Sequence, residues 1–214
     1  MAAAAPVIFF GDSICFGEKV GAHHGWVTRL AAAVETEFGE RFLVANSSIN
    51  GNTTRMALER MPFDVQRYAP QVLLVQFGLN DCNYWQTDRG VPRVSPRAFE
   101  ANLHEILDRG LAFGARALLL NTNHPTTRRT SFEHSGTVYE EGNRAYNEII
   151  RRVAADRADT ALVDIERAWN ERIASGVHLA SLLLADELHL SRAGHDAYVE
   201  IVGPPLLETL RGLA

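Results

Sequence analysis

Five short apolar runs, separated by stretches with helical periodicity, constrain the fold of this chain more than any other feature. The runs occupy residues 6–10, 41–48, 71–78, 116–123 and 160–165. Continuous apolar runs of this length, rich in β-branched residues, are typical of strands that are buried on both faces, as in a parallel sheet. We therefore predict an α/β fold with a three-layer α/β/α arrangement around a five-stranded parallel sheet.

The segments between the runs have the spacing and the end signals of helices. Helices are expected at residues 25–40, 53–61, 95–114, 138–157 and 166–175. Thr53 or Asn52 is a suitable cap for the second of these, and Ser95-Pro96 opens the third as an N-cap and first-turn pair. The last segment, 191–213, is also helical in pattern, and Pro204-Pro205 predicts an interruption in it.

Length and charge limit the class of protein. A chain of 214 residues, 46% hydrophobic and 22% charged, without a repeat or linker, suits a single domain over residues 1–214. The net charge is −5 and the basic residues are dispersed, so neither nucleic acid nor an anionic membrane is an expected partner. No window has the length and low charge of a membrane span, and a small molecule is the expected partner. The oligomeric state stays open.

The two cysteines and the N-terminus bear on location. Cys15 and Cys82 make neither a disulfide framework nor a Cys-x-x-Cys zinc motif. Two reduced thiols in a reducing, cytoplasmic compartment are expected, and a redox link between them is the alternative. The N-terminal "MAAAAPVIFF" lacks a basic segment and merges into the first strand, which argues against a signal peptide. A secreted protein whose signal has been removed is the other possibility.

Polar residues suited to chemistry follow the predicted strands. They are Asp12 and Ser13 after the first strand, Gly51 after the second, Asn80 and Asp81 after the third, Asn121 to His124 after the fourth, and Asp186 and His189 before the last helix. In an open parallel sheet, sites gather outside the carboxyl ends of the strands. We therefore expect these residues to meet at one edge of the sheet.

The residue types at this edge suit acyl transfer through a serine. A serine hydroxyl needs a neighbouring base, which His189 can supply, and the base needs its other ring nitrogen held, which Asp186 can do. The oxyanion that develops on the substrate needs donors. The N–H groups of Ser13 and Gly51 and the side-chain amide of Asn80 are the candidates.

Four ordered motifs carry a resemblance to a known family. They are "GDSI" at 11–14, "SINGNTT" around Gly51, "GLND" at 78–81 and "DELHLS" at 186–191. This set resembles the SGNH hydrolases, also called the GDSL esterase/lipase family, whose four named residues match Ser13, Gly51, Asn80 and His189, with Asp186 completing the triad. One departure is Ile14, where the name-giving motif has leucine, and this apolar exchange puts little in doubt.

The resemblance implies a flavodoxin-like sheet and a serine mechanism without metal or organic cofactor. It also implies action on short-to-medium acyl carboxylic esters. The "GW" after the first motif and the "DxLHLS" pattern are similar to a subgroup that acts on short esters, including acetyl groups on alcohols and sugars. The alternatives are a lysophospholipase or thioesterase, a carbohydrate deacetylase, an acyltransferase, and a non-catalytic flavodoxin-like binding module.

Each candidate residue also has a plainer interpretation. Ser13 alone would be a helix N-cap, Asn80 a turn residue, and Asp186 and His189 surface residues. Asp12 is expected to bond the backbone of its turn, and Asp81 to fix its loop. His195 is expected to be an ordinary helix residue. The pairs His23/His24 and His124/His134 are expected at the surface or rim rather than at a metal.

Two loops are expected to contact the substrate, because members of this family place specificity in them. From the loop after the third strand we predict Tyr84 and Trp85 as substrate-binding residues. From the loop after the fourth strand we predict Asn123 and His124.

Overall fold

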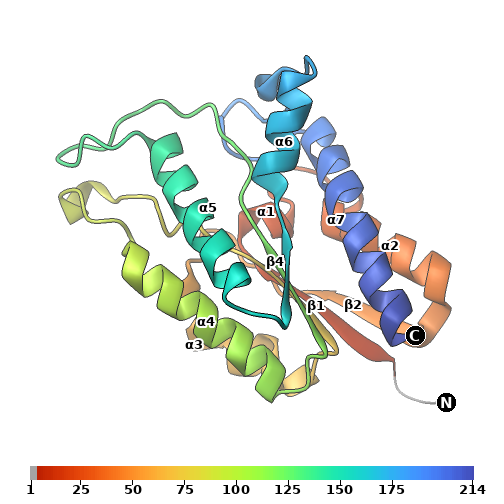
Figure 1. The fold of residues 1–214 in the computed structure, drawn as a ribbon. Coiled ribbons are helices and arrows are strands. Elements are labelled where there is room, and N and C mark those ends of the chain that lie inside the picture. Colours follow the sequence, from red (N-terminus) through yellow and green to blue (C-terminus); the bar gives the residue numbers. More distant parts are fainter. Residues whose placement is uncertain (1–3) are drawn as a thin grey trace.

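A five-stranded parallel sheet forms the centre of the computed structural model, which describes residues 4–214 (Figure 1). Its strands are β1 (Ala5–Gly11), β2 (Phe42–Asn46), β3 (Val72–Gln76), β4 (Ala117–Asn121) and β5 (Thr160–Val163). The order across the sheet is β2-β1-β3-β4-β5, and every neighbouring pair is parallel. The predicted sheet is confirmed, and its order is that of flavodoxin-like folds.

Helices cover both faces of the sheet. On one side lie α3 (Thr54–Asp64), α4 (Pro96–Ala112) and α5 (Tyr139–Ala155), and on the other lie α2 (Trp26–Phe38), α6 (Ile165–Ala174) and α7 (Arg192–Leu213) (Figure 1). A four-residue helix, α1 (Ser13–Phe16), follows β1 directly. Because β1 lies between β2 and β3, the chain leaves β1 in one direction and returns on its other side. In open sheets of this kind, ligands bind beside the carboxyl ends of the strands at such a reversal of strand order.

The central strands are buried on both faces. All side chains from Val7 to Phe10 in β1 and from Val72 to Val75 in β3 are wholly buried. The edge strands are not, since Leu43 in β2 and Leu162 in β5 are exposed. Burial on both faces accounts for the continuous apolar runs of β1 and β3 in the sequence.

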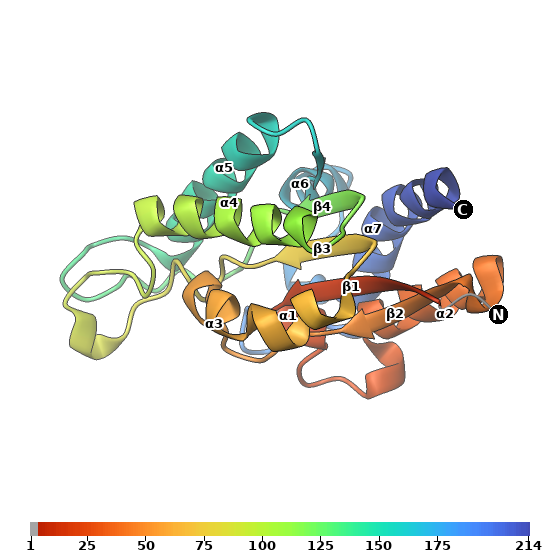
Figure 2. The same ribbon diagram turned by 90° about the horizontal axis from the view of Figure 1, so that it is seen from below.

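Two long loops leave the same end of the sheet. The loop after β3 and the loop after β4 extend side by side, to the left in both Figure 1 and Figure 2. Tyr84 in the first and Phe132 in the second stack with ring centroids 4.2 Å apart. This contact joins the two loops at the carboxyl end of the sheet.

The last helix differs from its prediction. Pro204 and Pro205 lie inside α7, which continues to Leu213, so the predicted interruption is wrong. The prolines remove two backbone donors, but Val202, Leu206 and Leu210 around them are buried. Packing of this apolar face against the rest of the molecule offsets the lost hydrogen bonds, as is usual for helices in proteins. Among residues 4–214 no helix is both long and apolar enough to cross a bilayer.

The start of α7 packs closely on the preceding segment, and this contact generates a stability prediction. A Cβ added at Gly194 would overlap the carbonyl oxygen of Leu182, whereas at Gly212 it would meet nothing within 4 Å. Gly194→Ala should therefore lower the free energy of unfolding by about 1–3 kcal/mol. Gly212→Ala, in the same helix, should change it by less than about 1 kcal/mol. Urea denaturation measures both, and equal effects would contradict this account of the packing.

Candidate active site

The turn between β1 and α1 presents Ser13 at the carboxyl edge of the sheet. Asp12 is the N-cap of α1, since its Oδ1 accepts a hydrogen bond of 3.0 Å from the N–H of Ile14. The interpretation of Ser13 as the cap is therefore wrong, and the expected backbone role of Asp12 is confirmed. Gly11 permits the tight turn, because a Cβ there would lie 2.7 Å from Sγ of Cys15. The Ser13 hydroxyl is therefore not needed as a cap for the short helix that it begins.

Three side chains form a hydrogen-bonded chain at this edge. The Ser13 Oγ lies 3.0 Å from Nε2 of His189, and Nδ1 of His189 lies 2.7 Å from Oδ2 of Asp186. An ionised carboxylate only accepts, so Nδ1 carries the proton and Nε2 accepts from the Ser13 hydroxyl. The sequence placed these residues at one edge, and the structure brings their side chains into contact.

The electrostatics of Asp186 favour its ionised form. Burial opposes ionisation, but hydrogen bonds from the Lys19 ammonium, from the His189 ring and from the N–H groups of Leu188 and His189 hold the pKa of Asp186 below its usual value. An ionised carboxylate fixes the imidazole tautomer and stabilises an imidazolium.

The loop that carries His189 is held from two sides. Leu183 and Leu190 form an antiparallel bridge, and the N–H of Leu184 donates to the carbonyl of His189 at 2.7 Å. Behind it, Nε2 of His124 donates to the carbonyl of Leu188 at 2.8 Å. These contacts limit the movement of the His189 ring relative to Ser13.

His124 belongs to a buried polar chain that runs from the sheet to this loop. The Gln76 side-chain amide donates to the hydroxyl of Tyr198 at 2.9 Å, and that hydroxyl donates to Nδ1 of His124 at 2.8 Å. Burial lowers the pKa of His124 to about 4, although its bond to Leu188 opposes the shift. His124 is thus a neutral side chain that supports the backbone of the loop carrying His189.

Asn123 and His124, which the sequence predicts to bind substrate, lie inside the fold. Both side chains are wholly buried. The Asn123 amide donates to the carbonyl of Phe77 at 3.2 Å, and its backbone N–H donates to Oδ1 of Asn147 at 2.8 Å. Most of their polar groups are used inside the fold, as is usual for buried polar atoms, although the side-chain oxygen of Asn123 has no hydrogen-bond partner among the described residues.

Gly51 and Asn80 lie in the loops on either side of Ser13. Gly51, between β2 and α3, has a φ of +74°, in the left-handed region that favours glycine. Asn80 follows β3, and its Nδ2 donates to Oδ2 of Asp12 at 3.1 Å. Since β1 lies between β2 and β3, the three loops are neighbours at the carboxyl edge.

Two buried carboxyl groups lie behind these loops. Burial raises the pKa of Asp12 to about 7, against the hydrogen bonds from Ile14 and Asn80, and the nearby Asp81 raises it further. Burial also raises the pKa of Asp81 to about 6, although the N–H and hydroxyl of Thr54 donate to its Oδ1. Asp81 joins the start of α3 to the loop after β3, which agrees with its predicted role.

Sequence reasoning missed Arg93. Its guanidinium donates to Oδ1 of Asn80 at 3.3 Å and to the carbonyl of Gly51 at 3.0 Å. It also lies over the ring of Trp85, 4.9 Å from the centroid. No local pattern in the sequence reveals these contacts, because they depend on how the loop after β3 folds back.

The loop residues Tyr84 and Trp85 occupy different surroundings. Trp85 is 58% exposed and lines a cavity of about 420 Å³ together with Met56 and Arg93. Tyr84 is half-buried against Phe132. Their contact with substrate stays a prediction, and Trp85 has the more accessible surface.

The remaining candidates have structural surroundings. Cys15 and Cys82 are buried free thiols, and burial raises the pKa of each. His195 is buried, and its Nδ1 accepts from the N–H of Trp26 at 3.2 Å. Within residues 4–214, no three His, Cys, Asp or Glu side chains are grouped so that they could hold a metal ion.

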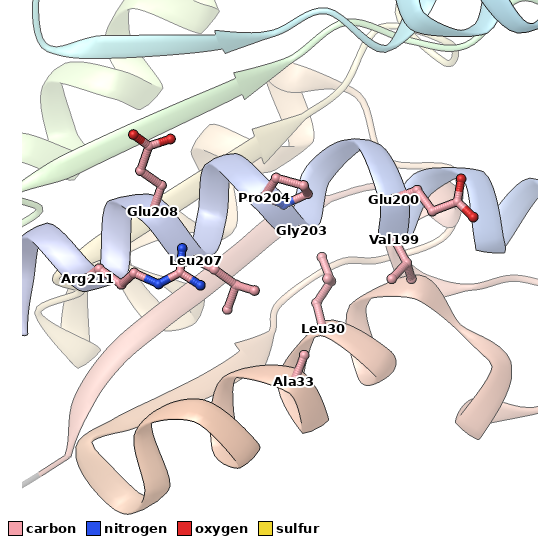
Figure 3. Close-up of a pocket in the computed structure, with 9 residues that line it drawn as sticks. All are labelled: Leu30, Ala33, Val199, Glu200, Gly203, Pro204, Leu207, Glu208 and Arg211. Carbon is pink, nitrogen blue, oxygen red and sulfur yellow. The ribbon is translucent and has the colours of Figure 1, made fainter.

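A further groove lies away from these residues. It has a volume of about 720 Å³ and runs between α2 and α7, with Leu30, Val199 and Leu207 among its walls (Figure 3). None of the residues in the hydrogen-bonded chain lines it. Here side-chain chemistry, and not cavity size, locates the candidate site.

A serine hydroxyl, a histidine and a carboxylate bonded in series are the arrangement that serine hydrolases use. The chain belongs to the GDSL-like lipase/acylhydrolase family, which it matches over residues 9–197. This is a family of ester hydrolases, as the resemblance of the four motifs implied.

Individual relatives agree with this assignment. The chain is 29% identical over 205 residues to Esterase TesA of Pseudomonas aeruginosa, a match that covers 96% of this chain and 89% of that protein. It is 29% identical over 124 residues to Thioesterase 1/protease 1/lysophospholipase L1 of Escherichia coli, covering 58% and 54%. The structure is similar to that of LAE5, an α/β hydrolase enzyme from the metagenome of Lake Arreo, Spain. That match has a TM-score of 0.74, 26% identity and 94% coverage of both chains.

The raised pKa of Asp12 generates a prediction about pH. The folded state keeps the Asp12 proton up to about pH 7, whereas the unfolded chain releases it near the ordinary value of 3.8. The folded state therefore binds more protons, and stability falls as the pH rises between these values, by up to about 1.4 kcal/mol per pH unit. Asp12→Asn should remove this one-proton contribution and leave that of Asp81.

The measurement is the free energy of unfolding of both proteins by urea denaturation at intervals from pH 5 to pH 8. The Asp12→Asn variant should show the shallower decline. Parallel curves would mean that Asp12 is already ionised in the folded state at pH 5.

Proposed function

We propose that this protein is a serine esterase that hydrolyses short-to-medium acyl carboxylic esters, including acetyl esters of small alcohols or sugars. The observation that supports this most is the series of hydrogen bonds from Ser13 through His189 to Asp186, at 3.0 and 2.7 Å. Both distances lie within the reach that proton transfer requires. Family membership supplies the reaction class.

In the first step, Ser13 Oγ attacks the acyl carbonyl carbon while its proton passes to Nε2 of His189. The resulting imidazolium is stabilised by the ionised Asp186. The carbonyl oxygen becomes an oxyanion, which we assign to the N–H groups of Ser13 and Gly51 and to Nδ2 of Asn80. Ser13 begins α1, so its N–H has no acceptor within the helix.

In the second step, the bond from the carbonyl carbon to the leaving oxygen breaks, and His189 donates its proton to the departing alcohol. The acyl group is then held as an ester on Ser13. A water molecule gives a proton to His189 and attacks the same carbon, and collapse of that intermediate releases the carboxylic acid and restores the Ser13 hydroxyl. These steps need no metal or organic cofactor.

Substrate contact is assigned to Trp85 and Tyr84. Trp85 lines a cavity together with Arg93, and Arg93 also bonds Asn80 of the proposed oxyanion hole. Its exposed apolar surface, with Met56 and Val91, suits an acyl chain or an apolar alcohol.

Thioester or lysophospholipid hydrolysis is the second candidate. It is favoured by the similarity to the Escherichia coli protein whose name includes both activities. The same residues would act, with a thiolate or a lysophospholipid alcohol as the leaving group.

Initial rates on p-nitrophenyl esters from acetate to palmitate test the proposal. The parent protein should turn over the short esters fastest, and Ser13→Ala should lose at least about 10³-fold in kcat. Ser175→Ala is the matched control, because the Ser175 hydroxyl bonds only the carbonyl of Arg172 and should not affect the rate.

Each other outcome has a defined meaning. Fastest turnover of the longest esters, or of acyl thioesters, would favour the second candidate. A folded protein without activity on any chain length would leave the non-catalytic binding module as the better account. Equal rates in the parent and Ser13→Ala would contradict the assignment of Ser13 as the nucleophile.

A further inference from the structure

We infer that Arg93 is a positioning residue of the oxyanion hole, holding Gly51 and Asn80 in the orientation that receives the reacting carbonyl. This inference rests on the proposed esterase function. It concerns a residue outside the four sequence motifs, which acts through its neighbours.

Arg93 joins the loops on the two sides of Ser13. One guanidinium nitrogen donates to the Asn80 side-chain oxygen at 3.3 Å, and the other terminal nitrogen donates to the Gly51 carbonyl at 3.0 Å. The first loop follows β3 and the second follows β2. A planar guanidinium with several fixed donors suits a link between two acceptors, and a lysine ammonium does not have this geometry.

The orientation of the Asn80 side-chain amide is set by its hydrogen-bond partners, because its oxygen and its NH2 group are nearly the same in shape. Rotation by half a turn would exchange its oxygen and its NH2 group. Arg93 has donors only, so it fixes the oxygen on its own side. The opposite end donates to Oδ2 of Asp12 at 3.1 Å, which uses one amide hydrogen and leaves the second for an oxyanion.

Arg93 is itself held firmly. Its backbone N–H donates to the carbonyl of Asn83 at 2.8 Å, and its guanidinium packs over the Trp85 ring and reaches Sδ of Met56 at 3.8 Å. The residue is half-buried. These contacts preorganise the guanidinium before any substrate binds, which is the condition for effective oxyanion stabilisation.

Because Arg93 also lines the cavity with Trp85, the rival interpretation is that it binds an anionic part of the substrate. The two roles predict different kinetics. A substrate-binding cation raises KM when removed, whereas a residue that orients transition-state donors lowers kcat. A neutral substrate, p-nitrophenyl acetate, separates them most cleanly.

The test compares Arg93→Ala, Arg93→Lys, Asn80→Ala and the double variant Asn80→Ala/Arg93→Ala. Loss of one oxyanion donor costs about 10²- to 10³-fold in kcat, so Arg93→Ala should cost about 10- to 100-fold, with KM changed by less than about threefold. Arg93→Lys should recover only part of the loss. The matched control is Arg97→Ala, an exposed arginine at the start of α4, which should keep the parent rate.

The double variant reports whether Arg93 acts through Asn80. Its loss should be at least about fivefold smaller than the product of the two single losses, since residues that act as one unit are not additive. The inference would be overturned if the loss in the double variant equalled the product of the two single losses. It would also be overturned by an unchanged kcat in Arg93→Ala, or by a rise in KM alone. Thermal melting of each variant identifies any that fail to fold, in which case Arg93→Lys carries the comparison.

A measurement without substrate keeps this inference separate from the proposed function. The side-chain NH2 signals of Asn80 in a ¹⁵N-correlated NMR spectrum, assigned by their loss in Asn80→Ala, should shift in Arg93→Ala and not in Arg97→Ala. Unmoved signals would contradict the positioning role. Moved signals in a protein without esterase activity would reject the function and keep the contact.

Discussion

The hydrogen bond between Ser13 and His189 joins residues that are 176 positions apart, and most of the structure around it serves to hold that contact. Ser13 is fixed by the central, wholly buried strand β1 and by the Asp12 cap. His189 is fixed by the loop that leads into α7. The contact therefore requires that the first strand and the loop before the last helix are both in place.

A buried polar chain links these parts. Gln76 in β3, Tyr198 in α7 and His124 after β4 are bonded in series, and His124 supports the carbonyl of Leu188 next to His189. Buried polar networks are stabilising only when their members are satisfied, and they then specify one arrangement. This series of hydrogen bonds fixes the position of the loop that carries His189 relative to the sheet.

Two carboxyl groups beside the hydrogen-bonded chain of Ser13 and His189 have opposite tendencies to ionise. Asp186, whose side chain is partly exposed to solvent, is held ionised by hydrogen bonds from Lys19, His189 and backbone N–H groups. Asp12, wholly buried below Ser13, keeps its proton to about pH 7. Their environments, and not their chemical type, set these states. One carboxylate is suited to stabilise an imidazolium, and the other to cap a turn and hold an amide.

Much of the fold followed from local sequence. Continuous apolar runs identified the strands, and Thr53 and Ser95 marked the starts of α3 and α4, where their hydroxyls accept from backbone N–H groups. The rule that loops share the carboxyl edge brought Ser13, Asp186 and His189 together. These predictions succeeded because strands and helix starts depend on short-range sequence patterns, and the placement of the loops depends on the geometry of a parallel sheet.

The sequence is least informative where long-range packing determines the structure. Asn123 and His124 follow a strand just as Asn80 does, but they turn inward, and loop sequence does not report burial. Pro204 and Pro205 would end an isolated helix, and the apolar face of α7 keeps it intact. Arg93 was missed because its role depends on two acceptors in loops that only the folded chain brings together.

The most direct test of the central claim is covalent labelling with a fluorophosphonate, followed by mass spectrometry of the digested protein. Such a probe reacts with a serine that a neighbouring base activates. The account predicts one adduct per chain, located on Ser13, and little labelling after His189→Ala. A folded protein that resists the probe, or that is modified at another serine, would contradict the claim that Ser13 and His189 form a working nucleophile and base.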